Sequence, residues 1–130
     1  MADLNVGDQV PELRVTPDKY LPHRYAGASG DFNPIHIDPE FAKAVGLPST
    51  ILHGLYSMGL VARANAALAG GDPRALKRLS VQFRGMGMPE TEIVVSGIVK
   101  SVEGDRVVID TVAAQGENTI IKNAEAELAL

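Results

Sequence analysis

The sequence predicts an α+β domain in which an antiparallel sheet curls around one long central helix. A run of apolar and small residues, 55–69, has the character of a helix that is buried on nearly all sides. Beyond residue 75 the apolar residues instead recur at every second position, in runs joined by short turns. That pattern is typical of consecutive antiparallel strands. A sheet that follows such a helix is expected to wrap around it.

Composition limits the kind of molecule this can be. At 130 residues the chain should form one domain, residues 1–130. Its 12 Lys and Arg residues stand against 16 Asp and Glu residues, and no basic cluster is interleaved with aromatic residues, so nucleic acid is not an expected partner. No cysteine is present, which excludes disulfides and thiolate chemistry. We expect no secretory signal and no membrane span. We expect a cytoplasmic location.

The first third of the chain predicts short elements. Residues 5–15 should be extended, and Gly7 and Pro11 permit only a short or edge strand there. A helix is expected to follow over residues 16–28. Because proline cannot sit in a helix interior without cost, Pro22 predicts a kink or a late start in that helix.

The middle of the chain predicts two further helices. Asp38 suits the N-cap of a short helix over residues 41–45, which Gly46 ends. The central helix, 55–69, should stop at the breaker sequence 70–73.

The last half predicts strands. Apolar and polar residues alternate over residues 79–84, and strands are expected at 93–101 and 106–114, joined by a hairpin turn at 103–105. A last strand should run over residues 119–130, with alanines and Leu128 on one face and glutamates on the other.

Residues 30–38 carry most of the chemistry, namely a carboxylate, an amide, an imidazole and a second carboxylate, on Asp31, Asn33, His36 and Asp38. Gly30 and Pro34 exclude a regular helix here. A loop kinked at Pro34 can nevertheless fold Asp31 and His36 toward one point, which is the minimum for acid-base chemistry on a small substrate.

This stretch is part of a longer ordered pattern, Tyr25-Ala26, Ser29-Gly30-Asp31, Asn33-Pro34-Ile35-His36 and Asp38, followed by His53-Gly54. The pattern resembles the signature of the MaoC-like (R)-specific enoyl-CoA hydratases and 3-hydroxyacyl dehydratases, over residues 5–128. The resemblance implies the hotdog fold. It also implies reversible addition of water to a trans-2-enoyl thioester, giving an (R)-3-hydroxyacyl product, in fatty-acid or polyhydroxyalkanoate-type metabolism.

The resemblance also implies roles for individual residues. Asp31 and His36 would handle the water and the proton at C2, and which of them is the acid or the base stays open. The N–H of Gly54 would stabilise the thioester oxygen, while Asn33 and His53 would position substrate or water. The substrate would be an acyl-CoA or acyl carrier protein thioester, with no cofactor.

Other interpretations of these residues exist. Asp31 could cap the turn before Pro34, and His36, between two isoleucines, could be a core histidine. His53 could join His36 and a carboxylate in a metal site, but no zinc-type helical spacing is present and no metal is expected. Ser57 lacks a Gly-x-Ser-x-Gly elbow, so serine hydrolase chemistry is disfavoured.

The chain departs from the family pattern at two places. Some of these hydratases carry a serine on the central helix facing the dyad, whereas residues 60–63 here have none. Residues 88–91 lack the usual Pro-Gly turn.

An uncovered sheet face and edge-to-edge pairing in relatives predict a homodimer, a heterodimer or a larger even oligomer. An acyl-CoA thioesterase or a non-catalytic subunit are the alternatives to a hydratase.

Overall fold

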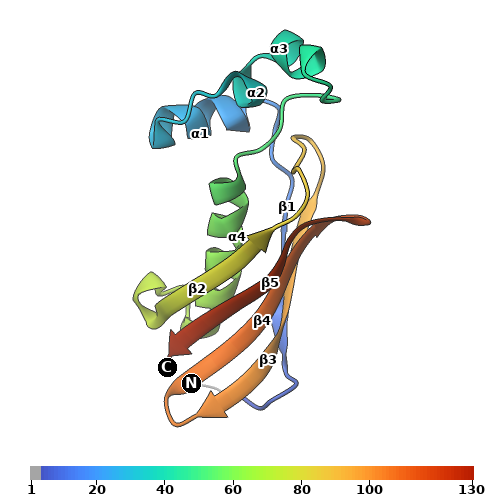
Figure 1. Ribbon diagram of the computed structural model, residues 1–130. Coiled ribbons are helices and arrows are strands. Elements are labelled where there is room, and N and C mark those ends of the chain that lie inside the picture. The colour runs from blue at the N-terminus through green and yellow to red at the C-terminus, as the bar shows by residue number, and fades with distance from the viewer. Residues whose placement is uncertain (1–3) are drawn as a thin grey trace.

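The computed structural model describes residues 4–130, which form one antiparallel sheet packed against a central helix (Figure 1). The sheet order is β1-β3-β4-β5-β2. The strands and helices are β1 (Gln9–Val15), α1 (Leu21–Ser29), α2 (Pro34–Ile37), α3 (Pro39–Ala44), α4 (Gly54–Ala66), β2 (Leu76–Phe83), β3 (Ile93–Glu103), β4 (Arg106–Gln115) and β5 (Asn118–Ala129), with two 3₁₀ turns, η1 (Ala67–Ala69) and η2 (Pro73–Ala75). This is the α+β hotdog arrangement that the sequence predicts.

The core lies between α4 and the inner face of the sheet. Val61 of α4 is fully buried and packs with Ile93, Ile121 and other apolar residues of the strands. The predicted alternation in β5 is confirmed, because Ala124, Ala126 and Leu128 are all 0% exposed. One face of the sheet therefore holds the helix, and the chain needs no second layer of helices.

The chain before α4 follows the sequence prediction closely. β1 is an edge strand, and its pairing with β3 shifts register between Val10 and Leu13, around Pro11. The first helix starts late, at Leu21, with Pro22 in its first turn. The side chain of Asp38 caps α3 by accepting hydrogen bonds from two backbone N–H groups.

One local expectation is wrong. Residues 34–37 form a single helical turn, α2, where no regular helix is predicted. Pro34 stands in the first turn, where its missing N–H has no intrahelical acceptor to lose, and Asn33 caps the turn with its side chain. Proline thus starts this helix, and His36 lies inside it.

The loop over residues 88–91, before β3, has an unusual backbone conformation in place of a Pro-Gly turn. Glu90 has φ 65°, in the left-handed region that favours glycine. Its N–H donates to the carbonyl of Pro17 at 2.6 Å, which ties the loop to the segment before α1. A glutamate therefore holds a backbone conformation that glycine adopts at lower cost.

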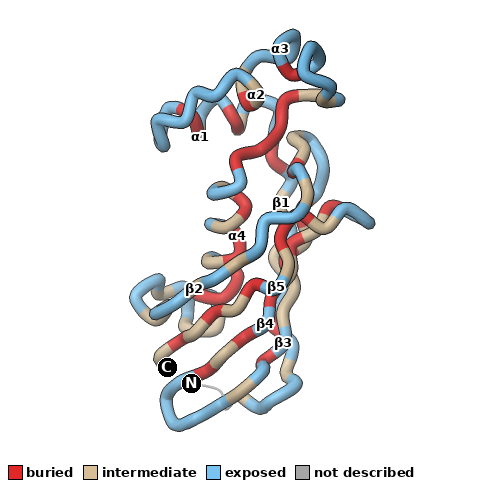
Figure 2. The backbone as a smooth tube through the Cα atoms, in the orientation of Figure 1, coloured by how far each residue is buried: buried red, intermediate tan, exposed pale blue. Residues whose placement is uncertain are grey.

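The sheet leaves part of α4 uncovered, unlike the helix buried on nearly all sides that the sequence predicts. Figure 2 shows buried, intermediate and exposed positions along α4. The exposed ones include Leu55, Gly59 and Arg63, each one turn from the next. Beside them, small residues of α4 and Leu76 at the start of β2 line an open groove of about 450 Å³. The sheet wraps one side of the helix, and the groove runs along the other.

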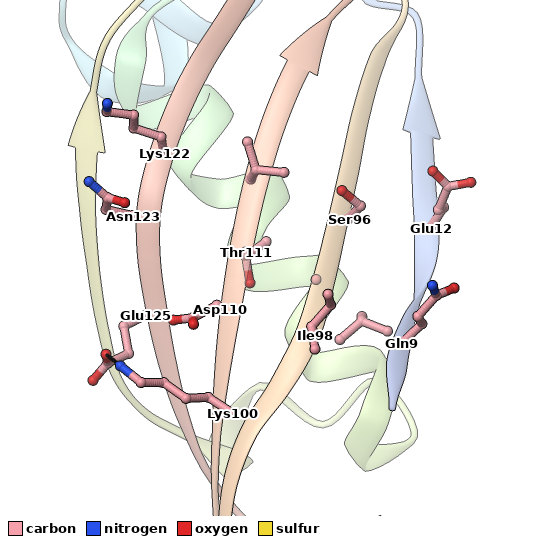
Figure 3. Close-up of a pocket in the computed structure, with 13 residues that line it drawn as sticks. Gln9, Glu12, Ser96, Ile98, Lys100, Asp110, Thr111, Lys122, Asn123 and Glu125 are labelled. Atoms are coloured by element: carbon pink, nitrogen blue, oxygen red, sulfur yellow. Dashed lines mark hydrogen bonds and ion pairs between the residues drawn. The ribbon is translucent and has the colours of Figure 1, made fainter. Parts of the chain in front are cut away.

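The outer face of the sheet is uncovered, as the sequence predicts, and it carries both polar and apolar side chains. Figure 3 views this face with α4 behind it, and the labelled side chains are mostly polar or charged. Lys100 and Glu125 form an ion pair of 3.0 Å across this face. Ile98, which is 52% exposed, and Val112 lie on the same face, so this surface is mixed in character. No helix within residues 4–130 is long and apolar enough to cross a membrane.

We predict that Gly97→Ala destabilises the fold. The new Cβ would lie 2.9 Å from the carbonyl oxygen of Asp110 and 3.2 Å from a methyl group of Val10, so three neighbouring strands would have to separate. The expected loss is about 1–3 kcal/mol of unfolding free energy, measured by urea titration at fixed protein concentration. Gly27→Ala, where nothing lies within 4 Å on α1, is the control and should raise stability by up to about 1 kcal/mol. Equal stability of the two variants would contradict the close-packing argument.

Candidate active site

Residues 29–36 fold into a series of tight turns held by their own side chains. The N–H of Asp31 donates to Ser29 Oγ, the N–H of Asn33 to Asp31 Oδ1, and the N–H of Ile35 to Asn33 Oδ1, each at 3.2 Å. Asp31 therefore does cap the turn before Pro34, as one interpretation of the sequence has it. Only Oδ1 does so, and Oδ2 is free to face His36.

His36 is held in one orientation by a backbone carbonyl. Its ring is buried, and Nδ1 lies 2.8 Å from the carbonyl oxygen of Ile51. Because a carbonyl only accepts hydrogen bonds, Nδ1 carries the proton, and the neutral ring has its lone pair on Nε2. Nε2 lies 3.8 Å from Asp31 Oδ2, too far for a direct hydrogen bond. The two residues that the sequence singles out thus face each other as two acceptors.

His53 contacts both members of this pair. Its ring stacks on that of His36, with centroids 3.8 Å apart and an interplanar angle of 21°. Nε2 of His53 donates to the backbone carbonyl of Asp31 at 2.9 Å, so the ring ties the Asp31 turn to the start of α4. The Tyr25 ring also contacts His53, with the ring centroids 4.7 Å apart. Nδ1 of His53 is buried with no hydrogen-bond partner within residues 4–130.

Gly54 is the first residue of α4, and its N–H has no acceptor among residues 4–130. The N-cap residue, His53, makes no side-chain capping bond. Within the described part of the chain no hydrogen bond from the Gly54 N–H is found, as expected at a helix start. Such an N–H group, at the positive end of the helix dipole, can stabilise a negatively charged oxygen.

Two cavities meet at Gly54. One, of about 280 Å³, is lined by Tyr25, Asp31 and His53 among others. The second, of about 190 Å³, is lined by His36 and by apolar residues of the strands. Gly54 and Phe83 line both. The Phe83 ring lies over Gly54 so closely that a Cβ there would meet Phe83 Cε1 at 3.1 Å, so any larger residue at this position would require the Phe83 ring to shift.

Two residues of this site were not predicted from the sequence. Ser57 is buried and lines the second cavity with His36, so the site does contain a helix serine, although residues 60–63 have none. Its signal was its spacing of three from Gly54, which places both on one side of a helix. Phe83 gave no signal, because only the pairing of β2 with β5 brings the end of that strand over the start of α4.

The donor set is close enough for a metal ion but is poorly oriented for one. Asp31, His36 and His53 offer ligand atoms that lie within 4.8 Å of one another. An imidazole lone pair lies in the ring plane, and two stacked rings direct their lone pairs side by side rather than at one point. The Nδ1 of His36 and the Nε2 of His53 are moreover used as donors to carbonyls. This geometry favours proton transfer over metal binding.

Comparison with known proteins agrees with the fold and the motif. The model of the family described as "MaoC like domain" matches residues 6–123. The chain belongs to the MaoC-like domain family. It is 36% identical over 113 residues to peroxisomal enoyl-CoA hydratase 2 of Arabidopsis thaliana, which covers 86% of this chain and 35% of the relative.

Solved structures agree as well. A MaoC-like dehydratase matches with a TM-score of 0.92 at 31% identity, over 98% of this chain and 41% of that chain. An (R)-hydratase of A. caviae involved in PHA biosynthesis matches with a TM-score of 0.82 at 23% identity, over 100% of this chain and 99% of that chain. The chain thus spans well under half of the Arabidopsis relative and of the dehydratase chain, and nearly all of the A. caviae chain.

We predict that dialysis against EDTA leaves the hydration of an enoyl thioester unchanged. The element that polarises the substrate would be the backbone N–H of Gly54, which a chelator cannot remove. Elemental analysis of the active protein should find well under one metal ion per chain. Loss of activity that one divalent ion restores would instead put His53 in a coordination shell, since a metal-bound water is lost with its metal.

Proposed function

We propose that this MaoC-like domain catalyses the reversible addition of water to a trans-2-enoyl thioester of CoA or acyl carrier protein, giving the (R)-3-hydroxyacyl thioester. The observation that carries the proposal is the pair of Asp31 Oδ2 and His36 Nε2, 3.8 Å apart, beside a helix start. The names of the family and of the Arabidopsis relative support the same reaction. The activity is thus a hydro-lyase activity that needs no cofactor.

In this mechanism the water molecule bridges the two acceptors. A water that donates one hydrogen to His36 Nε2 and one to Asp31 Oδ2 keeps a lone pair for attack on C3 of the substrate. As the C3–O bond forms, one O–H bond of the water breaks and its proton passes to the pair. The π electrons of the C2=C3 bond move toward the thioester, and the pair then delivers a proton to C2.

The negative charge that develops on the thioester oxygen needs a donor. The N–H of Gly54 supplies it in this proposal, with the dipole of α4 behind it. Donor and acid-base pair lie around the same two cavities, so C1, C2 and C3 of one substrate can meet both. Asn33 and His53 act through others: Asn33 caps α2, which carries His36, and His53 holds the Asp31 turn and the His36 ring.

A thioesterase with this fold would use a carboxylate to activate water against the carbonyl carbon and would release free CoA. An assay of crotonyl-CoA and a longer enoyl-CoA separates the two reactions. Loss of the enoyl absorbance without release of thiol supports the hydratase. Release of thiol would instead identify the protein as a thioesterase. No turnover of either substrate by the purified protein would favour a subunit that needs a different partner chain.

We predict that Asp31→Asn and His36→Ala each lower kcat/KM for crotonyl-CoA by at least about a hundredfold, the usual scale for lost acid-base catalysis. The matched control is Asp38→Asn. It makes the same chemical change within the same motif, and asparagine can still cap α3. Near-normal rates for either site variant, with the control also unchanged, would remove the Asp31 and His36 pair from the mechanism.

We further propose that the chain works as a homodimer, in the cytoplasm. The apolar surface that supports this lies around the site and along α4, where Leu55 is 63% and Phe83 53% exposed. The groove beside β2, an edge strand, offers small residues that let a second chain approach closely. A heterodimer would use the same surface.

Light scattering should accordingly give a mass of twice 13.8 kDa or a larger even multiple. Gly59→Glu, in the groove, should shift the protein toward the monomer, because nothing lies within 4 Å of a Cβ there and the longer side chain would occupy the space that a second chain needs. Ile98→Glu, on the outer face of the sheet, introduces the same charge away from the groove and should leave the mass unchanged. A stable, active monomer of the unchanged chain would contradict the proposal.

A further inference from the structure

Ser57 is a buried residue whose hydroxyl takes no part in the mechanism proposed above. The residue is 4% exposed and lines the cavity that also holds His36 and Gly54. Within residues 4–130 its N–H approaches the carbonyl of His53, but no hydrogen bond is found for its side chain. The hydroxyl therefore faces the cavity rather than another protein group.

The surroundings make this hydroxyl conspicuous. Apart from His36 and backbone glycines, the cavity is lined by apolar side chains, those of Ile51, Leu52, Phe83, Met86, Ile120 and Ile121. Ser57 Oγ is not among the fully buried atoms that lack a hydrogen-bond partner, so this hydroxyl is accessible from the cavity and has no protein partner within residues 4–130. A polar atom that enters the cavity with the substrate would give it that partner.

The helix directs Ser57 toward the N–H of Gly54. The two residues are three apart on the first turn of α4, so they share one side of the helix. Side chains of a helix also tilt toward its N-terminus, where the free N–H of Gly54 lies. One oxygen atom at this helix end can thus accept from both groups, since a carbonyl oxygen has two lone pairs.

We infer that Ser57 is a second oxyanion donor: its hydroxyl and the Gly54 N–H together hold the thioester oxygen of the substrate. The inference rests on the proposed hydratase function. When water adds to C3, the π electrons of C2=C3 shift and the C1 oxygen gains negative charge, which the Ser57 O–H stabilises by donating to it. The charge returns to C2 as that carbon takes its proton, so Ser57 itself neither gains nor loses one.

The kinetic test compares Ser57→Ala with Ser57→Thr. The alanine variant lacks the donor and should lose about a hundredfold in kcat with a small change in KM, the scale for one lost oxyanion donor. The threonine variant keeps a hydroxyl and should retain most of the rate. Ser49→Ala is the control, because it removes a partly buried hydroxyl whose partners, the Thr50 carbonyl and Met88 Sδ, lie outside both cavities.

A spectroscopic test reads the hydrogen bond itself. The thioester 4-(dimethylamino)cinnamoyl-CoA has an absorption band that moves to longer wavelength when its carbonyl oxygen accepts hydrogen bonds. The band of the bound probe should shift strongly in the unchanged protein and in Ser57→Thr, and clearly less in Ser57→Ala, while the Ser49→Ala control matches the unchanged protein. This readout would not respond to a purely structural role of the serine.

The outcomes separate this inference from the proposed function. A full rate, or an unchanged band, in Ser57→Ala overturns the role of Ser57 even if the unchanged protein hydrates crotonyl-CoA. A lower rate with an unchanged band overturns it too, since the hydroxyl would then act away from the thioester oxygen. Absence of hydration by the unchanged protein rejects the proposed function, whereas the band of the bound probe still reports on Ser57.

Discussion

The stacked imidazoles of His36 and His53 are the constraint on which the rest of the site depends. Each ring uses one nitrogen on a backbone carbonyl, His36 on Ile51 and His53 on Asp31. These two bonds fix which nitrogen of His36 carries the lone pair and hold the Asp31 turn against the start of α4. The segment between the rings is itself fixed, because the Ile51 N–H donates to the carbonyl of Ile35.

The sequence predicted the fold well where a residue's environment follows from its period. Alternation in β5 and the apolar run of α4 each depend on one face meeting one neighbour, so Leu128 and Val61 are buried as expected. The exposed line of α4 could not be predicted, because Leu55 and Gly59 fit a buried helix equally well. Only the curvature of the sheet decides which side of that helix it reaches.

The site was predictable to the extent that it is local. Asp31 and His36 lie in one short motif whose turns are made by its own side chains, so their approach could be inferred. Phe83 reaches the site from a strand about thirty residues beyond Gly54, and no period in either segment encodes that contact. The sequence also does not predict which nitrogen of His36 carries the lone pair, since this depends on the hydrogen bond to the carbonyl of Ile51.

The use of backbone carbonyls to orient both imidazoles has a consequence for sequence divergence. A carbonyl at position 51 or 31 is supplied by any amino acid, so the orientation of the rings imposes no demand on the side chain of Ile51. The imidazoles and the turn-forming side chains of Asp31 and Asn33, by contrast, make these contacts themselves. Most side chains that line the cavities can therefore change while the orientation of the two rings stays the same.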